Sequence, residues 1–218
     1  AMTMTAQVAL VGDMFAGARR TAFMGWQTAA INFSGFLFIG LAGYLAGLSP
    51  RLPFLVYALP VLLLPLLVAI LRTERWGGTA ADRPPEPETR SRRRFHWVRP
   101  AAAVGALTMI TVMLFFLMPS QLPFYLEERG FDSATATAIG LGALTLTGGF
   151  VAVTFRRISA RLGLAATFSL GFLLMAGGFA ALAVDATWGF ILIGAAVIGA
   201  GYALVQPCFL LLALQVAP

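Results

Sequence analysis

The chain has 218 residues, of which 59% are hydrophobic and 11% are charged. A soluble domain carries about 25% charged residues, so this composition excludes a water-facing surface, and most of the surface is expected to face lipid. The net charge is +6 and all 15 basic residues are arginine. They lie in short clusters between long apolar runs, which argues against nucleic acid as a partner and indicates loops at a membrane surface. Cys208 and His96 are each alone in the sequence, which excludes an internal disulfide and a metal site built on cysteine or histidine.

Six apolar stretches are long enough to cross a bilayer, which takes about 20 apolar residues in a helix. In chain order they are residues 23–48, 54–71, 101–126, 134–155, 164–184 and 188–216. The sequence therefore predicts an all-α membrane protein, a polytopic bundle of six transmembrane helices. The apolar residues 1–12 read as the tail of a helix that begins earlier, and the last stretch runs out with the chain. We therefore expect a piece of a longer protein.

Arginine is distributed unevenly over the two sides of the predicted bundle. If all six stretches span the membrane, 13 arginines fall on one side and only Arg51 and Arg129 fall on the other. An error of one helix would scramble this alternation, so the split supports the six spans. Because cytoplasmic loops are enriched in Arg and Lys, we place the Arg-rich side in the cytoplasm. We expect an integral, multi-pass protein of the cell (plasma or inner) membrane.

One long polar segment divides the predicted spans. It is rich in proline and charge at residues 81–88 and carries a basic run at residues 90–94, which indicates an extended and solvated linker. The basic run either anchors the cytoplasmic side or contacts anionic lipid through the same charges. We therefore predict the end of an N-terminal helical bundle with two full spans (1–71), a cytoplasmic basic linker (72–99) and a C-terminal bundle with four spans (100–218).

Polar side chains are few inside the spans, and no ionisable residue lies near a span centre. A charge there costs about 2.5–3.5 kcal/mol, and its absence leaves no visible carboxylate for proton or ion coupling. Asn32, Gln121 and Gln206 are the candidates to face a substrate cavity, although a buried amide more often forms a hydrogen bond between helices. Gln121 is favoured, because Pro119 and Pro123 flank it and are expected to break the helix, and broken helices line cavities.

Enzyme signatures do not occur in the sequence. It has no H-E-x-x-H metal motif, no Walker phosphate loop and no G-x-S-x-G nucleophile elbow. No pair of carboxylates lies in a span to perform acid–base chemistry. We therefore predict a protein that is not an enzyme, with no catalytic residues, no metal site and no cofactor.

Four short segments carry a family resemblance. They are an acidic-then-basic run at residues 13–20, Gly-Leu-Ala-Gly at 40–43, a polar pair between prolines at 118–126, and an Arg-rich loop at 156–163. Together with the long linker, their order resembles the major facilitator superfamily, in which two six-helix bundles are joined by a long cytoplasmic loop. The resemblance makes the six spans similar to the fifth to tenth of twelve helices, and segment 118–126 looks like the end of the seventh helix in small-solute and drug exporters.

The resemblance implies a secondary transporter that works by alternating access, in which two bundles rock about a site at mid-membrane depth. It implies a small-molecule substrate, export of a drug- or sugar-like solute, and a proton as the candidate coupling ion. Asp13, Arg19, Arg20 and Arg161 would then hold the cytoplasmic gate. The alternative is a six-helix membrane scaffold or sensor that does not transport.

Overall fold

The computed structural model describes residues 17–49, 51–54, 65, 69, 98–184 and 187–216. This part of the chain is helical and forms α2 (Gly17–Leu48), α4 (Val98–Glu128), α5 (Ser133–Leu162), α6 (Leu164–Val184) and α7 (Trp188–Val216). All five helices are long and apolar enough to cross a membrane. The predicted all-helical class and five of the predicted spans are confirmed. The predicted span 54–71 and the predicted linker 72–99 lie mostly outside the described residues.

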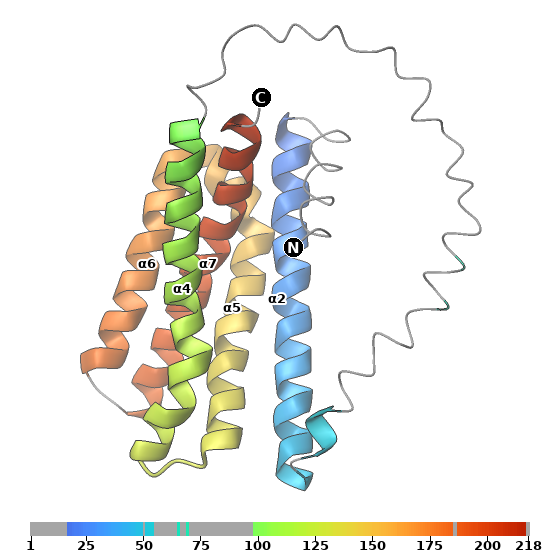
Figure 1. Cartoon of the computed structure of the whole chain (residues 1–218), viewed down its shortest axis with the longest axis vertical. Coiled ribbons are helices and arrows are strands. Elements are labelled where there is room, and N and C mark those ends of the chain that lie inside the picture. The colour runs from blue at the N-terminus through green and yellow to red at the C-terminus, as the bar shows by residue number, and fades with distance from the viewer. Residues whose placement is uncertain are drawn as a thin grey trace, which may run out of the picture.

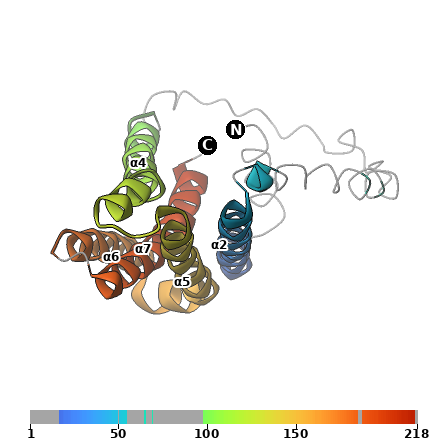
Figure 2. The ribbon, with the colours of Figure 1, turned by 90° about the horizontal axis from the view of Figure 1, so that it is seen from below.

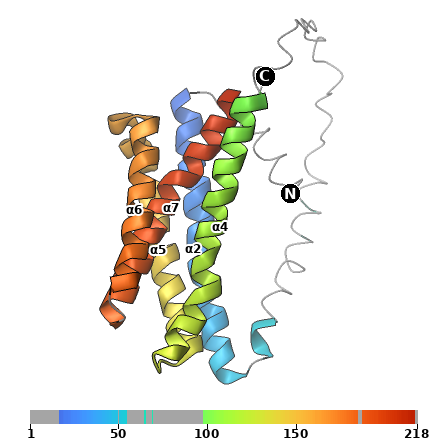
Figure 3. The same cartoon turned by 60° about the vertical axis from the view of Figure 1, so that its left-hand side comes forward.

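The helices lie side by side along the long axis of the molecule (Figure 1). Viewed along that axis, α6, α7, α5 and α2 follow one another in a row, and α4 stands on one side of the row (Figure 2). α7 crosses the bundle obliquely (Figure 3). Half of its most apolar stretch is buried, compared with 11% for α2 and for α4. The corresponding stretch of α5 is 44% buried, so α7 and α5 form the centre of packing, and most of the surface of α2 and α4 is left for lipid or for other helices.

Two tight turns set the antiparallel order of the neighbouring helices. Between α4 and α5, Gly130 takes a positive φ of 76°, and the Phe131 N–H donates to the Leu126 carbonyl at 3.1 Å. Between α5 and α6, Gly163 has a φ of 81° and donates its N–H to the Ser159 carbonyl at 2.9 Å. Glycine suits both positions because it lacks a Cβ. Such short connections reverse the direction of the chain, so that the two helices joined by each turn run antiparallel.

The two ends of the bundle differ in charge. The beginning of α2 and the end of α5 carry a cluster that we call the Arg-rich end: Arg19, Arg20, Arg156, Arg157 and Arg161. At the opposite, Arg-poor end lie Arg51 and Arg129. The Arg-rich end is at the top of Figure 1. This distribution follows the split that the sequence predicts.

The core is built where α7 meets its neighbours. Towards the Arg-poor end, α4 and α7 share an aliphatic cluster with α5. Its buried members are Met118, Leu122, Leu126, Ala136, Leu144, Ile191, Ala195 and Ile198. α6 packs on α7 through facing glycines: a Cβ on Gly171 would lie 2.9 Å from the Gly201 carbonyl oxygen, and one on Gly178 would lie 2.7 Å from that of Gly194. Small residues at such crossings let helix backbones approach closely in lipid.

α4 continues without interruption through two prolines, so the expected break around Gln121 is wrong. Pro119 and Pro123 both lie inside the helix. Proline is tolerated in membrane helices when nearby groups satisfy the backbone that it disturbs. The Ser120 hydroxyl donates to the Phe116 carbonyl at 2.7 Å, next to the Phe115 carbonyl, which Pro119 leaves without its usual N–H donor.

Candidate functional site

α2 and α5 pack along most of their length through small residues. The pairing is antiparallel and runs from Gly25, beside Phe155, to Gly43, which contacts Ala138. A Cβ on Gly25 would lie 2.9 Å from the Ala152 carbonyl oxygen, and one on Gly149 would lie 2.9 Å from the Phe33 ring. We call this contact the glycine seam. Its glycines bring the two helices close together and leave room for aromatic rings such as that of Phe33.

Asn32 lies at the centre of the glycine seam, where three helices meet. Its side chain is 8% exposed, and its Nδ2 donates to the Thr28 carbonyl of the same helix at 2.9 Å. A Cβ on Gly148 of α5 would lie 2.7 Å from Asn32 Oδ1 and 3.1 Å from the carbonyl oxygen of Gly199 on α7. We call Asn32, Gly148 and Gly199 the three-helix junction. The Asn32 side chain therefore packs between helices, while the hydrogen bond donated by its amide stays within α2.

On the Arg-rich side of the junction the same three helices are closed against each other. Ala29 of α2, Ala152 of α5 and Ala203 of α7 form one buried cluster, and their exposed fractions are 1%, 0% and 0%. The side chains that meet here are three methyl groups, which are small enough for α2 to approach α7 beside α5. The three helices are therefore in contact at this level.

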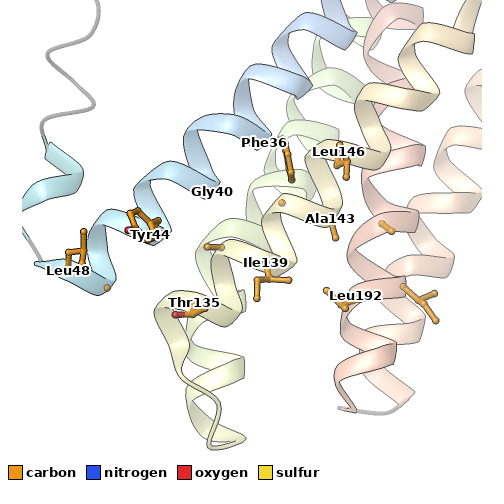
Figure 4. Close-up of a pocket in the computed structure, with 15 residues that line it drawn as sticks. Phe36, Gly40, Tyr44, Leu48, Thr135, Ile139, Ala143, Leu146 and Leu192 are labelled. Carbon is orange, nitrogen blue, oxygen red and sulfur yellow. The ribbon is translucent and has the colours of Figure 1, made fainter.

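On the Arg-poor side of the junction α2 and α7 diverge and leave a cavity of about 930 Å³ over α5, which we call the apolar groove (Figure 4). Among the described residues of its lining, Tyr44 and Thr135 carry the only polar side chains. Its walls are formed by Phe36, Gly40, Gly43, Tyr44, Gly47 and Leu48 of α2, Thr135, Ala138, Ile139, Gly142, Ala143 and Leu146 of α5, and Leu192, Ile193 and Ala196 of α7. α4 lies on the side of α5 that faces away from the groove. Gly140 of α5 faces Leu122 of α4, whereas Gly142, which lines the groove, is about 200° further around the helix.

The three predicted cavity residues do not lie on one level. Phe115 of α4 stacks on Tyr202 of α7, with ring centroids 3.7 Å apart. Gln121 is exposed and follows Phe115 towards the Arg-poor end, whereas Gln206 is half-buried and follows Tyr202 towards the Arg-rich end. At about 1.5 Å per residue, the two amides are separated by about 15 Å along the helices. None of the three residues Asn32, Gln121 and Gln206 lines the apolar groove.

The predicted gate arginines gather at one end of the glycine seam. Continuing the antiparallel pairing beyond Gly25 and Phe155 brings Arg19 level with Arg161. Both side chains are exposed and Arg20 is half-buried. Among the described residues, all the carboxylates lie at the Arg-poor end, on Glu127, Glu128 and Asp132. Like charges repel when they approach each other, so an anion or a carboxylate between Arg19 and Arg161 would favour a closed Arg-rich end. The predicted partner, Asp13, lies outside the described residues.

Sequence reasoning missed the apolar groove. Gly40 and Gly47 are visible in the sequence, but their spacing predicts helix packing, and in the structure a Cβ on either would meet nothing within 4 Å. The opening depends on the angle between α2 and α7, for which one sequence carries no signal. Among the described residues, no group of His, Cys, Asp and Glu could hold a metal ion.

Five membrane-length helices, a central α7 and a glycine seam between α2 and α5 define a polytopic α-helical membrane protein. The family model described as Major Facilitator Superfamily matches residues 1–218, the whole chain. The chain therefore belongs to the major facilitator superfamily and is a membrane transporter, as the resemblance in its sequence implies. Neither a curated protein nor a solved structure matches the chain. Its surroundings are the lipid bilayer, and its cargo is a small molecule.

Proposed function

We propose that this protein is a secondary active transporter that exports a small solute by alternating access. The observation that supports this most strongly is the one-sided geometry of α2 against α5 and α7. The three helices are closed at the Arg-rich side of the three-helix junction and diverge at the Arg-poor side. Alternating access requires two such arrangements, with opposite ends open.

The proposal assigns the helices to two moving bodies. α2 belongs to the N-terminal bundle, and α4 to α7 belong to the C-terminal bundle. The glycine seam then lies between the bodies, and Asn32 acts as its pivot, because the contact with Gly148 and Gly199 is equally far from both ends. Closing the Arg-poor end would bring Gly47 towards Thr135. Opening the other end would separate Arg19 from Arg161, which like-charge repulsion favours.

The substrate site is proposed to include the three amides Asn32, Gln121 and Gln206. Gln206 is the best placed of these, since it lies one turn from the Phe115–Tyr202 stack, where an aromatic surface and an amide donor are adjacent. Export as the direction is supported by the resemblance of residues 118–126 to small-solute and drug exporters. The Arg-rich end is proposed to face the cytoplasm of a cell membrane, and a proton is the proposed coupling ion.

Cross-linking tests the proposed motion. In a Cys208→Ala background, the pair Arg19→Cys and Arg161→Cys is bridged with a short, cleavable thiol reagent, and so is the pair Gly47→Cys and Thr135→Cys in a second variant. Efflux of a lipophilic fluorescent dye and of a radiolabelled sugar from cells is then measured. We expect either bridge to stop export and cleavage to restore it, because each bridge holds one end shut.

A matched control comes from α5 alone. The pair Val153→Cys and Arg157→Cys lies on the exposed side of one helix, so bridging it constrains no motion between bodies and should leave export unchanged. The two bridged ends should also differ in labelling: bridging the Arg-rich end should raise the reaction of Gly47→Cys with an impermeant maleimide. Unaltered labelling and export with both ends bridged would contradict alternating access and favour a membrane scaffold.

A further inference from the structure

The apolar groove has the depth of one leaflet of a bilayer. Its lining runs from Thr135 to Leu146 on α5 and from Phe36 to Leu48 on α2. At about 1.5 Å per residue, these walls extend for about 16–18 Å. The hydrocarbon core of a bilayer is about 30 Å thick, so one leaflet contributes about 15 Å. The groove therefore begins near the Arg-poor surface and ends at mid-membrane depth, beside the three-helix junction.

Polar and apolar groups of the groove are separated by depth. Tyr44 and Thr135 lie within about one turn of the Arg-poor ends of their helices. The deep end offers apolar side chains, from Phe36, Leu146 and Ala196, and no charged residue of the described part of the chain contributes to the lining. A charged solute would lose its hydration here without a compensating partner. The arrangement suits an amphiphile that keeps a polar group at the surface and places an alkyl tail inward.

The groove is open along its side. Tyr44, Leu48 and Ile193 are 70%, 63% and 59% exposed, although they belong to membrane-length helices. In a bilayer, exposed faces of this kind meet hydrocarbon wherever no other helix covers them. We propose that the apolar groove binds the acyl chain of a membrane lipid from the Arg-poor leaflet, with the lipid's polar group beside Tyr44 and Thr135.

This lipid site is separate from the three amides proposed for the substrate, and its occupancy does not depend on transport. The bound chain lies between α2 and α7, the two helices that diverge. A ligand shifts an equilibrium towards the state that it binds better. An acyl chain in the groove therefore favours the arrangement that is open at the Arg-poor end.

Two glycines allow the groove to be filled without disturbing the fold. A Cβ on Gly40 or Gly47 would meet nothing within 4 Å, so Gly40→Leu and Gly47→Leu direct a side chain into the empty groove. Gly105 on α4 and Gly177 on α6 are matched controls, since a Cβ on either also meets nothing within 4 Å and neither lines the groove. All four substitutions add the same side chain to a membrane-facing helix.

The experiment uses the whole chain in vesicles of phosphatidylcholine that contain a small share of the same lipid with a photoreactive diazirine in the middle of one acyl chain. After irradiation, the cross-linked residues are mapped by peptide mass spectrometry, and the oligomeric state is measured in mild detergent. We expect adducts concentrated on residues 36–48 and 135–146 of the unmodified protein. They should fall several-fold in Gly40→Leu and be unchanged in Gly105→Leu.

Two results would overturn the proposal. Adducts spread evenly over the exposed faces of all the helices in the unmodified protein would show ordinary lipid contact and no site. This result decides the question even if a leucine variant fails to fold. A dimer that becomes monomeric in Gly40→Leu, with no adducts in the groove of the unmodified protein, would identify a second copy of the chain as the occupant. Neither result depends on dye or sugar export, so the lipid site and the proposed function fail independently.

Discussion

Crowding at the three-helix junction gives a prediction that can be worked out from the structure. In Gly148→Ala the new Cβ would lie 2.7 Å from Asn32 Oδ1 and 3.1 Å from the Gly199 carbonyl oxygen. Overpacking of this kind costs about 1–3 kcal/mol. Replacing glycine by alanine in a helix gains about 0.8–1.0 kcal/mol. We therefore expect Gly148→Ala to be between neutral and about 2 kcal/mol less stable than the unmodified protein.

A control isolates the crowding from the helix propensity. Gly105→Ala makes the same chemical change where a Cβ meets nothing within 4 Å, so it should be neutral or stabilising by about 1 kcal/mol. The difference between the two variants should then be about 1–3 kcal/mol. The assay is reversible unfolding in mixed detergent micelles, followed by circular dichroism at several denaturing-detergent fractions.

A double-mutant cycle shows whether contact with Asn32 causes the loss of stability in Gly148→Ala. Asn32→Ala removes the oxygen that lies 2.7 Å from the new Cβ and leaves the Gly199 contact in place. The cost of Gly148→Ala should therefore fall by at least about 0.5 kcal/mol in this background, which is typical of residues in contact. An equal cost of Gly148→Ala in the unmodified protein and in the Asn32→Ala background would refute the account of the junction given above.

Three further predictions concern other parts of the molecule. Tyr125→Phe should lower the stability by about 0.5–1.5 kcal/mol in the same unfolding assay, because the Tyr125 hydroxyl donates to the Leu182 carbonyl at 3.1 Å and ties α4 to α6; no change would show that water replaces this bond. Gln121→Ala should impair dye or sugar export without lowering the membrane level measured by immunoblot, and unchanged export would remove Gln121 from the substrate site. In a Cys208→Ala background, Arg129→Cys should react with an impermeant maleimide added outside intact cells and Arg161→Cys should react only after permeabilisation; the reverse pattern would invert the proposed topology.

The spans are the part of the fold that the sequence predicts best. A bilayer requires about 20 apolar residues in a helix, so each span is visible in its own segment of sequence. The helix ends are less well predicted, because helices continue beyond the hydrocarbon. α2 begins at Gly17 where residue 23 is predicted, and α5 reaches Leu162 where residue 155 is predicted. Arg156 and Arg157 extend α5 as exposed side chains, which a search for apolar residues alone does not include.

The candidate site is harder to predict because it depends on how the helices cross. Asn32 can be selected from the sequence as an uncommon amide in an apolar helix, and the structure shows it buried at the three-helix junction. Its neighbours Gly148 and Gly199 are on other helices, and a hydropathy pattern carries no information about which faces meet. The two prolines of α4 were misleading for a related reason: whether a proline breaks a membrane helix depends on how neighbouring groups satisfy the freed carbonyls, which the sequence alone does not show.

The central position of α7 has a consequence for how the protein is made. α4, α5 and α6 leave the ribosome before α7, and each can insert into the membrane on its own apolar stretch. Half of the most apolar stretch of α7 is buried, and α6 packs on it through facing glycines, so α6 meets its main partner only when α7 arrives, whereas α5 already packs on α2. At about 5–20 residues per second, α6 waits for a few seconds with its small-residue face uncovered. During synthesis this bundle therefore assembles late, and its inserted intermediates are candidates for a membrane chaperone.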